Sequence, residues 1–235
     1  MASDAVDPPA VSLPFVLSLV AGSTDMIGFL GLNGLFTAHI TGNLVVLAAH
    51  VINGDPAILS YVLAVPVFML VLLLTRLFAS WLERRGAATL RPLLLLELLL
   101  LITFLVCCPS RGQRFDANSG IAIAAGMFGV AAMAVQTALV QISLRKAPST
   151  AVMTTNVAHF MLALGELLAG GDEAVVASAR KRVTHIFPVI VGFALGCVLG
   201  AAGQAAYGLW SLGLPAGLAL LAVVMSLTGE GKNID

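Results

Sequence analysis

The stretch AGSTDMIGFLGLNGLFTAHITGN, residues 21–43, interrupts an otherwise apolar sequence with polar side chains. It holds one carboxylate, Asp25, with a histidine, three threonines and two asparagines, while the residues around it are mostly Leu, Val and Ala. At membrane depth an ionisable group costs about 2.5–3.5 kcal/mol even on translocon-insertion scales. Asp25 is therefore a candidate functional residue, and we expect the rest of the chain to hold this stretch in place.

The composition is that of an integral membrane protein. Of the 235 residues, 59% are hydrophobic and 10% are charged, and the mean hydropathy is +1.01, whereas a soluble domain has roughly 25% charged residues. The formal net charge is zero and no basic or acidic block occurs. We therefore expect the lipid bilayer as a partner, and no nucleic acid.

The N-terminus and the cysteines carry no processing or redox signal. Residues 1–12 contain Asp4 and Asp7 but no Lys or Arg, and so lack the basic region of a signal peptide. We expect the first apolar segment to stay in the mature protein. Cys107, Cys108 and Cys197 lie at or inside apolar segments without metal-ligand or redox spacing, and we interpret them as packing residues.

The distribution of basic residues indicates which apolar segments cross a membrane. Eight such segments occur, at residues 13–32, 34–52, 58–82, 90–108, 120–142, 150–169, 185–207 and 210–227. If all eight cross, six Lys and Arg residues lie on each side. If the second and sixth, the most polar, return to the side they came from, ten share one side and only Arg111 and Arg114 face the other. This is the cytoplasmic bias of membrane proteins, although seven spans, with only the sixth segment failing to cross, give the same bias.

Internal similarity favours two returning segments. The second segment contains Thr-Gly-Asn at 41–43 and the sixth contains Thr-Thr-Asn at 154–156, and the segment after each carries a proline, Pro66 or Pro188. Treating the halves alike gives three crossings each, so the second half runs inverted relative to the first, as in many secondary transporters.

We therefore predict an all-α polytopic membrane protein made of two inverted three-span repeats, each with a broken or re-entrant polar segment. The predicted parts are an N-terminal tail (1–12), a first membrane repeat (13–108), a connecting loop (109–119), a second membrane repeat (120–227) and a C-terminal tail (228–235). We expect these repeats to enclose a polar site near the membrane midplane.

Polar residues recur at helical spacing in the second and sixth segments, and we expect both stripes to line one aqueous cavity. The stripes are His39, Asn43, Val46 and His50, and then Asn156, His159, Ala163 and Glu166, with Asp25, Gln136 and Gln141 facing the cavity from the preceding helices. Asp25 is the predicted proton or cation site. The predicted substrate-binding residues are Asp25, His39, Thr41, Asn43, Gln136, Thr155, Asn156, His159 and Glu166.

Several polar residues also have a structural interpretation. Asn43, Asn156 and the threonines serve equally well as bridges between helices, each worth about 0.6 kcal/mol. Glu97, amid LLLLELLLL, is predicted to reach toward Arg91 at the membrane surface rather than to titrate. Asp25 has no basic residue near it in sequence, so it must pair across helices, take a proton or hold a cation.

The seventh segment contains a stripe of small residues. Gly192, Gly196 and Gly200 recur at every fourth position, which lets two helices approach closely. Packing within the monomer is the simpler interpretation, and a homodimer through this stripe is the alternative.

A set of small, aromatic and polar residues in both halves resembles a known family. The first half carries Ala21-Gly22, Asp25, Gly28-Phe29, Gly34, Phe36 and Thr41-Gly42-Asn43, and the second carries Met133, Gln136, Ala138, Thr155 and Leu164-Gly165-Glu166. Over nearly its whole length the chain resembles the YoaK-type family of bacterial inner-membrane proteins. The resemblance implies a compact multi-pass protein of the bacterial cytoplasmic membrane, and it supplies no substrate. Thr137 stands where this pattern has Asn, and Thr155 where it has Gly, so the second half differs here.

These observations predict a secondary transporter of a small polar solute or ion. No GxxxxGK[ST] loop occurs, so transport driven directly by ATP needs a partner. The alternative is a membrane sensor or assembly factor without a transported substrate. An intramembrane enzyme is less favoured, since no HExxH, GxSxG or carboxylate pair at helical spacing occurs. We predict no enzymatic activity, no cofactor and no resident metal, because Asp25 and the histidines 39, 50 and 159 are spread over segments without a ligand motif.

We predict that the C-terminus and the basic residues at 84–85 and 180–182 are cytoplasmic, while Arg111 and Arg114 face out. Cysteine accessibility scanning with an impermeant reagent measures this. Position 232 should label only after the membrane is permeabilised, and labelling of intact cells at that position contradicts the topology. The same labelling at the N-terminus distinguishes six spans from seven.

Overall fold

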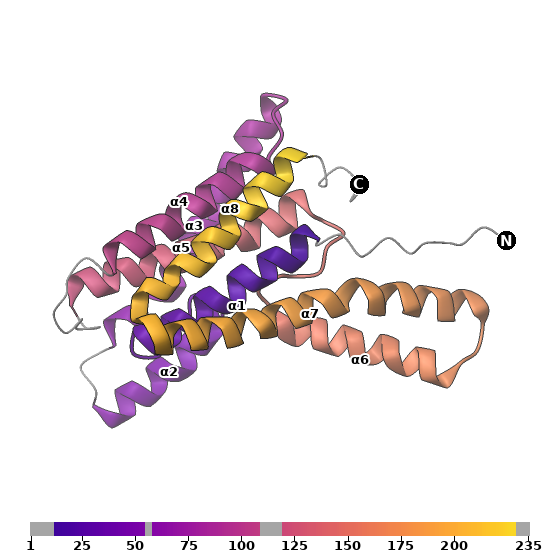
Figure 1. The fold of residues 1–235 in the computed structure, drawn as a ribbon, viewed down its shortest axis with the longest axis horizontal. Helices are drawn as coiled ribbons and strands as arrows, with labels where there is room; N and C mark the ends of the chain where they lie inside the picture. The colour runs from indigo at the N-terminus through magenta and orange to yellow at the C-terminus, as the bar shows by residue number, and fades with distance from the viewer. Residues whose placement is uncertain (1–11, 55–57, 109–118, 229–235) are drawn as a thin grey trace.

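The computed structural model describes residues 12–54, 58–108 and 119–228, and over these residues the chain is all-helical (Figure 1). The elements are α1 (Leu13–Gly31), α2 (Ile40–Asn53), α3 (Leu59–Arg84), α4 (Leu90–Cys107), α5 (Gly120–Ser143), α6 (Met153–Ala169), α7 (Glu173–Tyr207), the 3₁₀ helix η1 (Gly208–Leu212) and α8 (Gly213–Thr228). The all-α prediction is confirmed for this part of the chain. Nearly all of the predicted tails and connecting loop, including Arg111, Arg114 and Lys232, lie outside the described residues.

α1 and α5 form the centre of the bundle. In each of them 72% of the most apolar 18-residue stretch is buried, compared with 17% in α3. α1 packs on α7 and α8, α5 packs on α3 and α4, and α4 also packs on α8. The outer helices expose large apolar side chains, among them Leu73 of α3, Leu99 of α4, Val198 of α7 and Leu220 of α8. Helices that are apolar on their outer as well as their inner face are typical of membrane spans.

Among the described residues, five helical stretches are long and apolar enough to cross a membrane. They are α1, α3, α4, α5 and the stretch Glu173–Thr228, in which α7, η1 and α8 follow one another. α2 and α6, with 14 and 17 residues, are not among them, and a spanning helix needs about 20 residues. The chain thus has the helices of a multi-pass membrane protein. α2 and α6 are the helices of the two segments predicted to return.

A break in the helical backbone precedes each of these two short helices. Directly after α1, Asn33 and Gly34 take positive φ angles of 54° and 91°, which turn the chain off the helix axis. The chain then runs without α-helix to His39, the N-cap of α2. In the second half it runs without helix from Leu144, after α5, to Val152, the N-cap of α6. We call residues 32–39 the first break and residues 144–152 the second break.

α7 begins earlier than the predicted seventh segment, which starts at His185. Its N-cap is Asp172, whose carboxylate accepts a hydrogen bond from the backbone N–H of Ala174 at 3.3 Å. The basic residues 180–182 are therefore helical. The hydropathy pattern missed this part of α7 because polar and charged side chains make up half of it, and most of its residues are exposed. Figure 1 shows it running beside α6, to the right of the other helices.

The glycine stripe of α7 packs against α1 within the chain. A Cβ at Gly196 would lie 2.5 Å from the carbonyl oxygen of Leu19. A Cβ at Gly22 of α1 would lie 2.2 Å from the carbonyl oxygen of Phe193. The small residues thus allow backbone-to-backbone contact inside the monomer. A homodimer through Gly192, Gly196 and Gly200 stays a prediction, and it requires a surface that α1 covers.

Basic residues from separate elements gather at one end of the bundle. The hydroxyl oxygen of Thr89 lies 2.8 Å from that of Ser143, which brings the start of α4 to the end of α5. Nε2 of His185 lies 3.1 Å from the carbonyl oxygen of Lys146, which brings α7 to the same place. Arg84 and Arg85 lie at the end of α3, and a short connection leads from them to α4. This arrangement is compatible with a shared cytoplasmic side, on which the predicted topology depends.

We predict that Gly196→Ala destabilises the protein, because the new methyl group overlaps the Leu19 carbonyl oxygen. Overpacking of this kind costs about 1–3 kcal/mol, so the melting temperature of the detergent-purified variant should fall. The matched control is Gly165→Ala in α6, where a Cβ meets open space. That change should raise stability slightly, by about 0.5–1 kcal/mol. Equal melting temperatures for the two variants would contradict the close α1–α7 contact.

Candidate functional site

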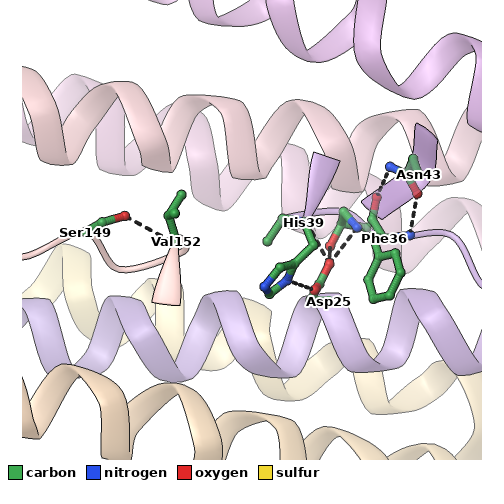
Figure 2. Close-up of polar contacts among 8 residues, drawn as sticks. Asp25, Phe36, His39, Asn43, Ser149 and Val152 are labelled. Carbon is green, nitrogen blue, oxygen red and sulfur yellow. Dashed lines mark hydrogen bonds and ion pairs between the residues drawn. The ribbon is translucent and has the colours of Figure 1, made fainter. Parts of the chain in front are cut away.

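The first break is held by the carboxylate of Asp25, which lies in α1 and is only 4% exposed. Oδ1 accepts hydrogen bonds from the backbone N–H groups of Thr37 and Ala38, each at 2.7 Å, and from the Thr37 hydroxyl at 3.3 Å. Oδ2 lies 2.6 Å from Nδ1 of His39 (Figure 2). Non-helical backbone at membrane depth needs such internal partners. The carboxylate therefore supplies the acceptors that the break itself lacks.

Asp25 pairs with His39, and pairing was one of the three possibilities that the sequence left open for this carboxylate. His39 comes 14 residues later in the sequence, and the turn after α1 brings it back. Its ring packs edge-on between the rings of Phe36 and Phe193, with centroids at 5.8 Å and 5.6 Å. The side chain is 39% exposed. His39 therefore connects a buried carboxylate to a more open surface.

Asn43 secures the first break from the other side. Its amide nitrogen donates to the carbonyl oxygen of Phe36 at 2.8 Å, and its Oδ1 accepts from the backbone N–H of Phe36 at 2.9 Å (Figure 2). Both backbone groups of one non-helical residue are thus satisfied by one buried amide. The interpretation of Asn43 as a bridge fits this geometry, although what it joins is a loop and a helix.

The second break has the same construction with a different core. The Asn156 amide donates to the carbonyl oxygen of Ser149 at 2.6 Å, again across seven residues, and the Ser149 hydroxyl accepts from the backbone N–H of Val152 at 3.0 Å. Gln136 of α5 donates from Nε2 to the Thr150 hydroxyl at 2.7 Å and to the Leu17 carbonyl oxygen of α1 at 2.8 Å. Ala38 and Ala151, one from each break, belong to one apolar cluster with residues of α1 and α5.

The two breaks therefore share a sequence pattern that comparison of Thr-Gly-Asn with Thr-Thr-Asn missed. Residues 36–43 read FTAHITGN and residues 149–156 read STAVMTTN. In both, Thr-Ala directly precedes the N-cap, and the final Asn bonds the residue seven positions earlier. This repeated spacing was the sequence signal from which the role of the Thr37 and Ala38 backbone amides could have been predicted. The halves differ at the N-cap, which is His39 in the first and Val152 in the second.

The other predicted site residues lie in separate places rather than along one cavity. Thr41 is exposed on the first turn of α2, and the His50 ring stacks on that of Tyr61 at 5.0 Å. Glu166 forms an ion pair with Arg182 across α6 and α7. A groove of about 380 Å³ is lined by three of the predicted residues, Thr155, Asn156 and His159. Lys146, Arg182 and His185 also line it. Gln141 lines a neighbouring pocket of about 230 Å³ with Thr137 and Thr150.

Glu97 does not reach toward Arg91. Arg91 donates to the carbonyl oxygen of Ser226 in α8, at 3.0 Å from Nη2. Glu97 is fully buried in α4. Sequence reasoning therefore missed a carboxyl group on α4 that is buried inside the bundle.

Fold and breaks together define a helical multi-pass membrane protein with two interrupted polar segments beside its central helices. The model of a protein family described as "Protein of unknown function (DUF1275)" matches residues 13–225. The chain belongs to this family. Neither a search of curated proteins nor a search of solved structures gave a match.

We predict that Asp25→Asn is nearly as stable as the wild type, whereas Asp25→Ala is not. The Asn side chain keeps an acceptor for the amides of Thr37 and Ala38, while Ala leaves both buried N–H groups unpaired, at about 1–3 kcal/mol each. Ser18→Ala is the control, since the Ser18 hydroxyl bonds only the Pro14 carbonyl oxygen of its own helix. Thermal unfolding in detergent should rank Ala at position 25 well below the other two variants. Equal melting temperatures for Asp25→Ala and Ser18→Ala would mean that the carboxylate does not hold the break.

Proposed function

We propose that the protein is a secondary transporter of a small polar solute or ion in the bacterial cytoplasmic membrane. The main observation behind this proposal is the pair of breaks. In each of them, side chains that include one from a central helix hold buried non-helical backbone. Non-helical backbone is tolerated at membrane depth only where protein buries it or water reaches it. In transporters such interrupted helices surround the substrate near the midplane. The YoaK-type resemblance supports the bacterial location.

The helix packing supports two inverted repeats, α1–α4 and α5–α8. α1 packs on α7 and α8 of the other half, and α5 packs in the same way on α3 and α4. α2 packs on α3 as α6 packs on α7. Gln136, in the second half of α5, bonds Leu17 near the start of α1, while a Cβ at Gly126, near the start of α5, would approach Leu32 after α1. α1 and α5 therefore run in opposite directions, as inversion requires.

In this proposal each repeat crosses the membrane three times and carries one re-entrant segment. The crossing helices are α1, α3 and α4 in the first repeat and α5, α7 and α8 in the second, with α2 and α6 as the re-entrant helices. Alternating access then consists of one repeat moving against the other around the two breaks. The glycine contact between α1 and α7 supplies a smooth surface for such a movement, because no side chain projects from the stripe.

We propose that the solute binds between the breaks. His39 offers a half-exposed imidazole whose Nδ1 is fixed by Asp25. The groove at the second break offers Thr155, Asn156 and His159 near the cationic side chains of Lys146 and Arg182. Both surfaces offer hydrogen-bonding groups, which suit a small polar molecule or an ion. The alternative function is a sensor or assembly factor, and the following experiment distinguishes it from a transporter.

A thermal-shift screen of the purified protein against amino acids, small carboxylates and inorganic ions should identify a stabilising solute. Proteoliposomes should then accumulate that solute, and a protonophore or ionophore should abolish the accumulation. His39→Gln should lower the uptake rate per folded molecule by about tenfold or more, since hydrogen bonds to charged groups contribute about 1.5–3 kcal/mol. Thr103→Ala, on the exposed face of α4, is the control and should transport normally. A stabilising solute without uptake in any gradient would favour the sensor or assembly factor.

A further inference from the structure

Unpaired buried acceptors concentrate on two side chains. Among the described residues, the buried side-chain oxygen and nitrogen atoms without a hydrogen-bond partner are both carboxyl oxygens of Glu97 and Oε1 of Gln136. Both residues are 0% exposed. A buried acceptor without a donor destabilises the folded state, and more strongly if it is charged. Three such atoms on two side chains require a physical explanation.

The register of α4 against α5 places these two side chains at the same level. The helices are antiparallel, since Thr89 before α4 bonds Ser143 at the end of α5. Further along, a Cβ at Gly129 would lie 2.8 Å from the Phe104 ring. Glu97 lies about two helical turns before Phe104, and Gln136 about two turns after Gly129, so both keep the same face and the same height.

The surroundings offer Glu97 no counter-charge. The elements packed on α4 are α5, α8 and η1, and none of them contains an ionisable side chain. In α1, behind α5 and α8, the only ionisable group is Asp25, which the first break already engages. On α4 itself Arg91 is bonded to the Ser226 carbonyl oxygen, and Cys107 lies near the far end. An isolated carboxylate in such a place carries a desolvation penalty of several kcal/mol, and buried groups of this kind neutralise instead.

We propose that Glu97 is a proton-binding site, with its protonated carboxyl group donating a hydrogen bond to Oε1 of Gln136. One proton then satisfies the Gln136 acceptor and removes the buried charge. The alternative ligand, a metal cation, needs several oxygen ligands. Gln136 Oε1 is the one uncommitted side-chain oxygen that α5 brings to this level. From α8, the Ser226 hydroxyl is already engaged, since it donates to the Val223 carbonyl oxygen.

The site connects to the second break through Gln136. The amide that accepts from Glu97 donates from Nε2 to the Thr150 hydroxyl and to the Leu17 carbonyl oxygen. Release of the proton leaves a carboxylate facing an acceptor, which favours rotation of the Gln136 amide or entry of water between α4 and α5. Either change alters the hydrogen bond to Thr150. Resting on the proposed transport function, this makes the proton the coupling ion and Glu97 its carrier, with Asp25 as the anchor of the first break.

The direct test is infrared spectroscopy of the purified protein in detergent at neutral pH. The wild type should show the carbonyl stretch of a protonated carboxylic acid, and Glu97→Gln should lack it. Glu97→Gln keeps the shape and a donor for Gln136, so its melting temperature should equal or exceed that of the wild type. Asp25→Asn, the control, should keep the band. Identical wild-type and Glu97→Gln spectra in this region would overturn the proton site, as would a sodium-dependent melting temperature that Glu97→Gln abolishes.

Gln136→Leu tests the hydrogen bond itself. Without the acceptor, the carbonyl stretch of Glu97 should move to higher frequency, toward that of a free acid. Circular dichroism and gel filtration verify that the variant folds, and Gln136→Asn, which keeps a shorter amide, serves as a second variant if it does not. An unchanged band in a folded variant would overturn the Glu97–Gln136 bond.

Transport readings separate this site from the transport proposal. In proteoliposomes Glu97→Gln should exchange solute at the wild-type rate but lose accumulation driven by a proton gradient. If Glu97→Gln accumulates solute as the wild type does, the coupling role is wrong. If the wild type shows the carboxyl band and transports nothing, the proton site stands and the transport proposal fails. If the wild type transports solute and the carboxyl band is absent, the transport proposal stands and the proton site fails.

Discussion

The structure depends on one buried carboxylate that takes the place of helical hydrogen bonding. Inside the bundle the chain leaves α1 and runs without helix to α2, where its N–H groups have no water to bond in a hydrocarbon environment. Asp25 offers one oxygen to the amides of Thr37 and Ala38 and the other to His39, while Asn43 serves the backbone of the same loop. The residue that is most costly in a membrane is therefore the one that allows the break.

The two polar segments that are too short to span could be predicted from the sequence, but the contacts of the breaks before them could not. Polar residues inside apolar segments are visible one at a time, and α2 and α6 are indeed the short helices. The pairing of Asp25 with His39 depends on the turn at Asn33 and Gly34, which hydropathy does not encode. The repeated Thr-Ala before each N-cap was the stronger signal, because it fixes which backbone amides face the central helices. The helical periodicity began at His39 and therefore gave no information on residues 36–38, which are not helical.

Glu97 shows the same limit in another form. Snorkelling toward Arg91 was a reasonable prediction for a glutamate near a basic residue at a helix start. Residues six positions apart differ by about 120° around a helix axis, so the two side chains cannot share a face. Which face turns inward depends on the packing of α4 on α5 and α8. The apolar run around Glu97 is nearly uniform, so no alternation of polar and apolar residues indicates which face of the helix turns inward.

The two breaks are alike in backbone and unlike in their polar surroundings, and this difference gives them different roles. In the first break a carboxylate meets two amides, a hydroxyl and an imidazole, so its acceptors are saturated and its geometry is fixed. Beside the second break the acceptors outnumber the donors, since Gln136 keeps a free oxygen at the level of Glu97. A surplus of acceptors is relieved by adding a proton. The break that holds its shape and the site that can change its charge are therefore distinct, and α1, bonded to Gln136 through Leu17, joins them.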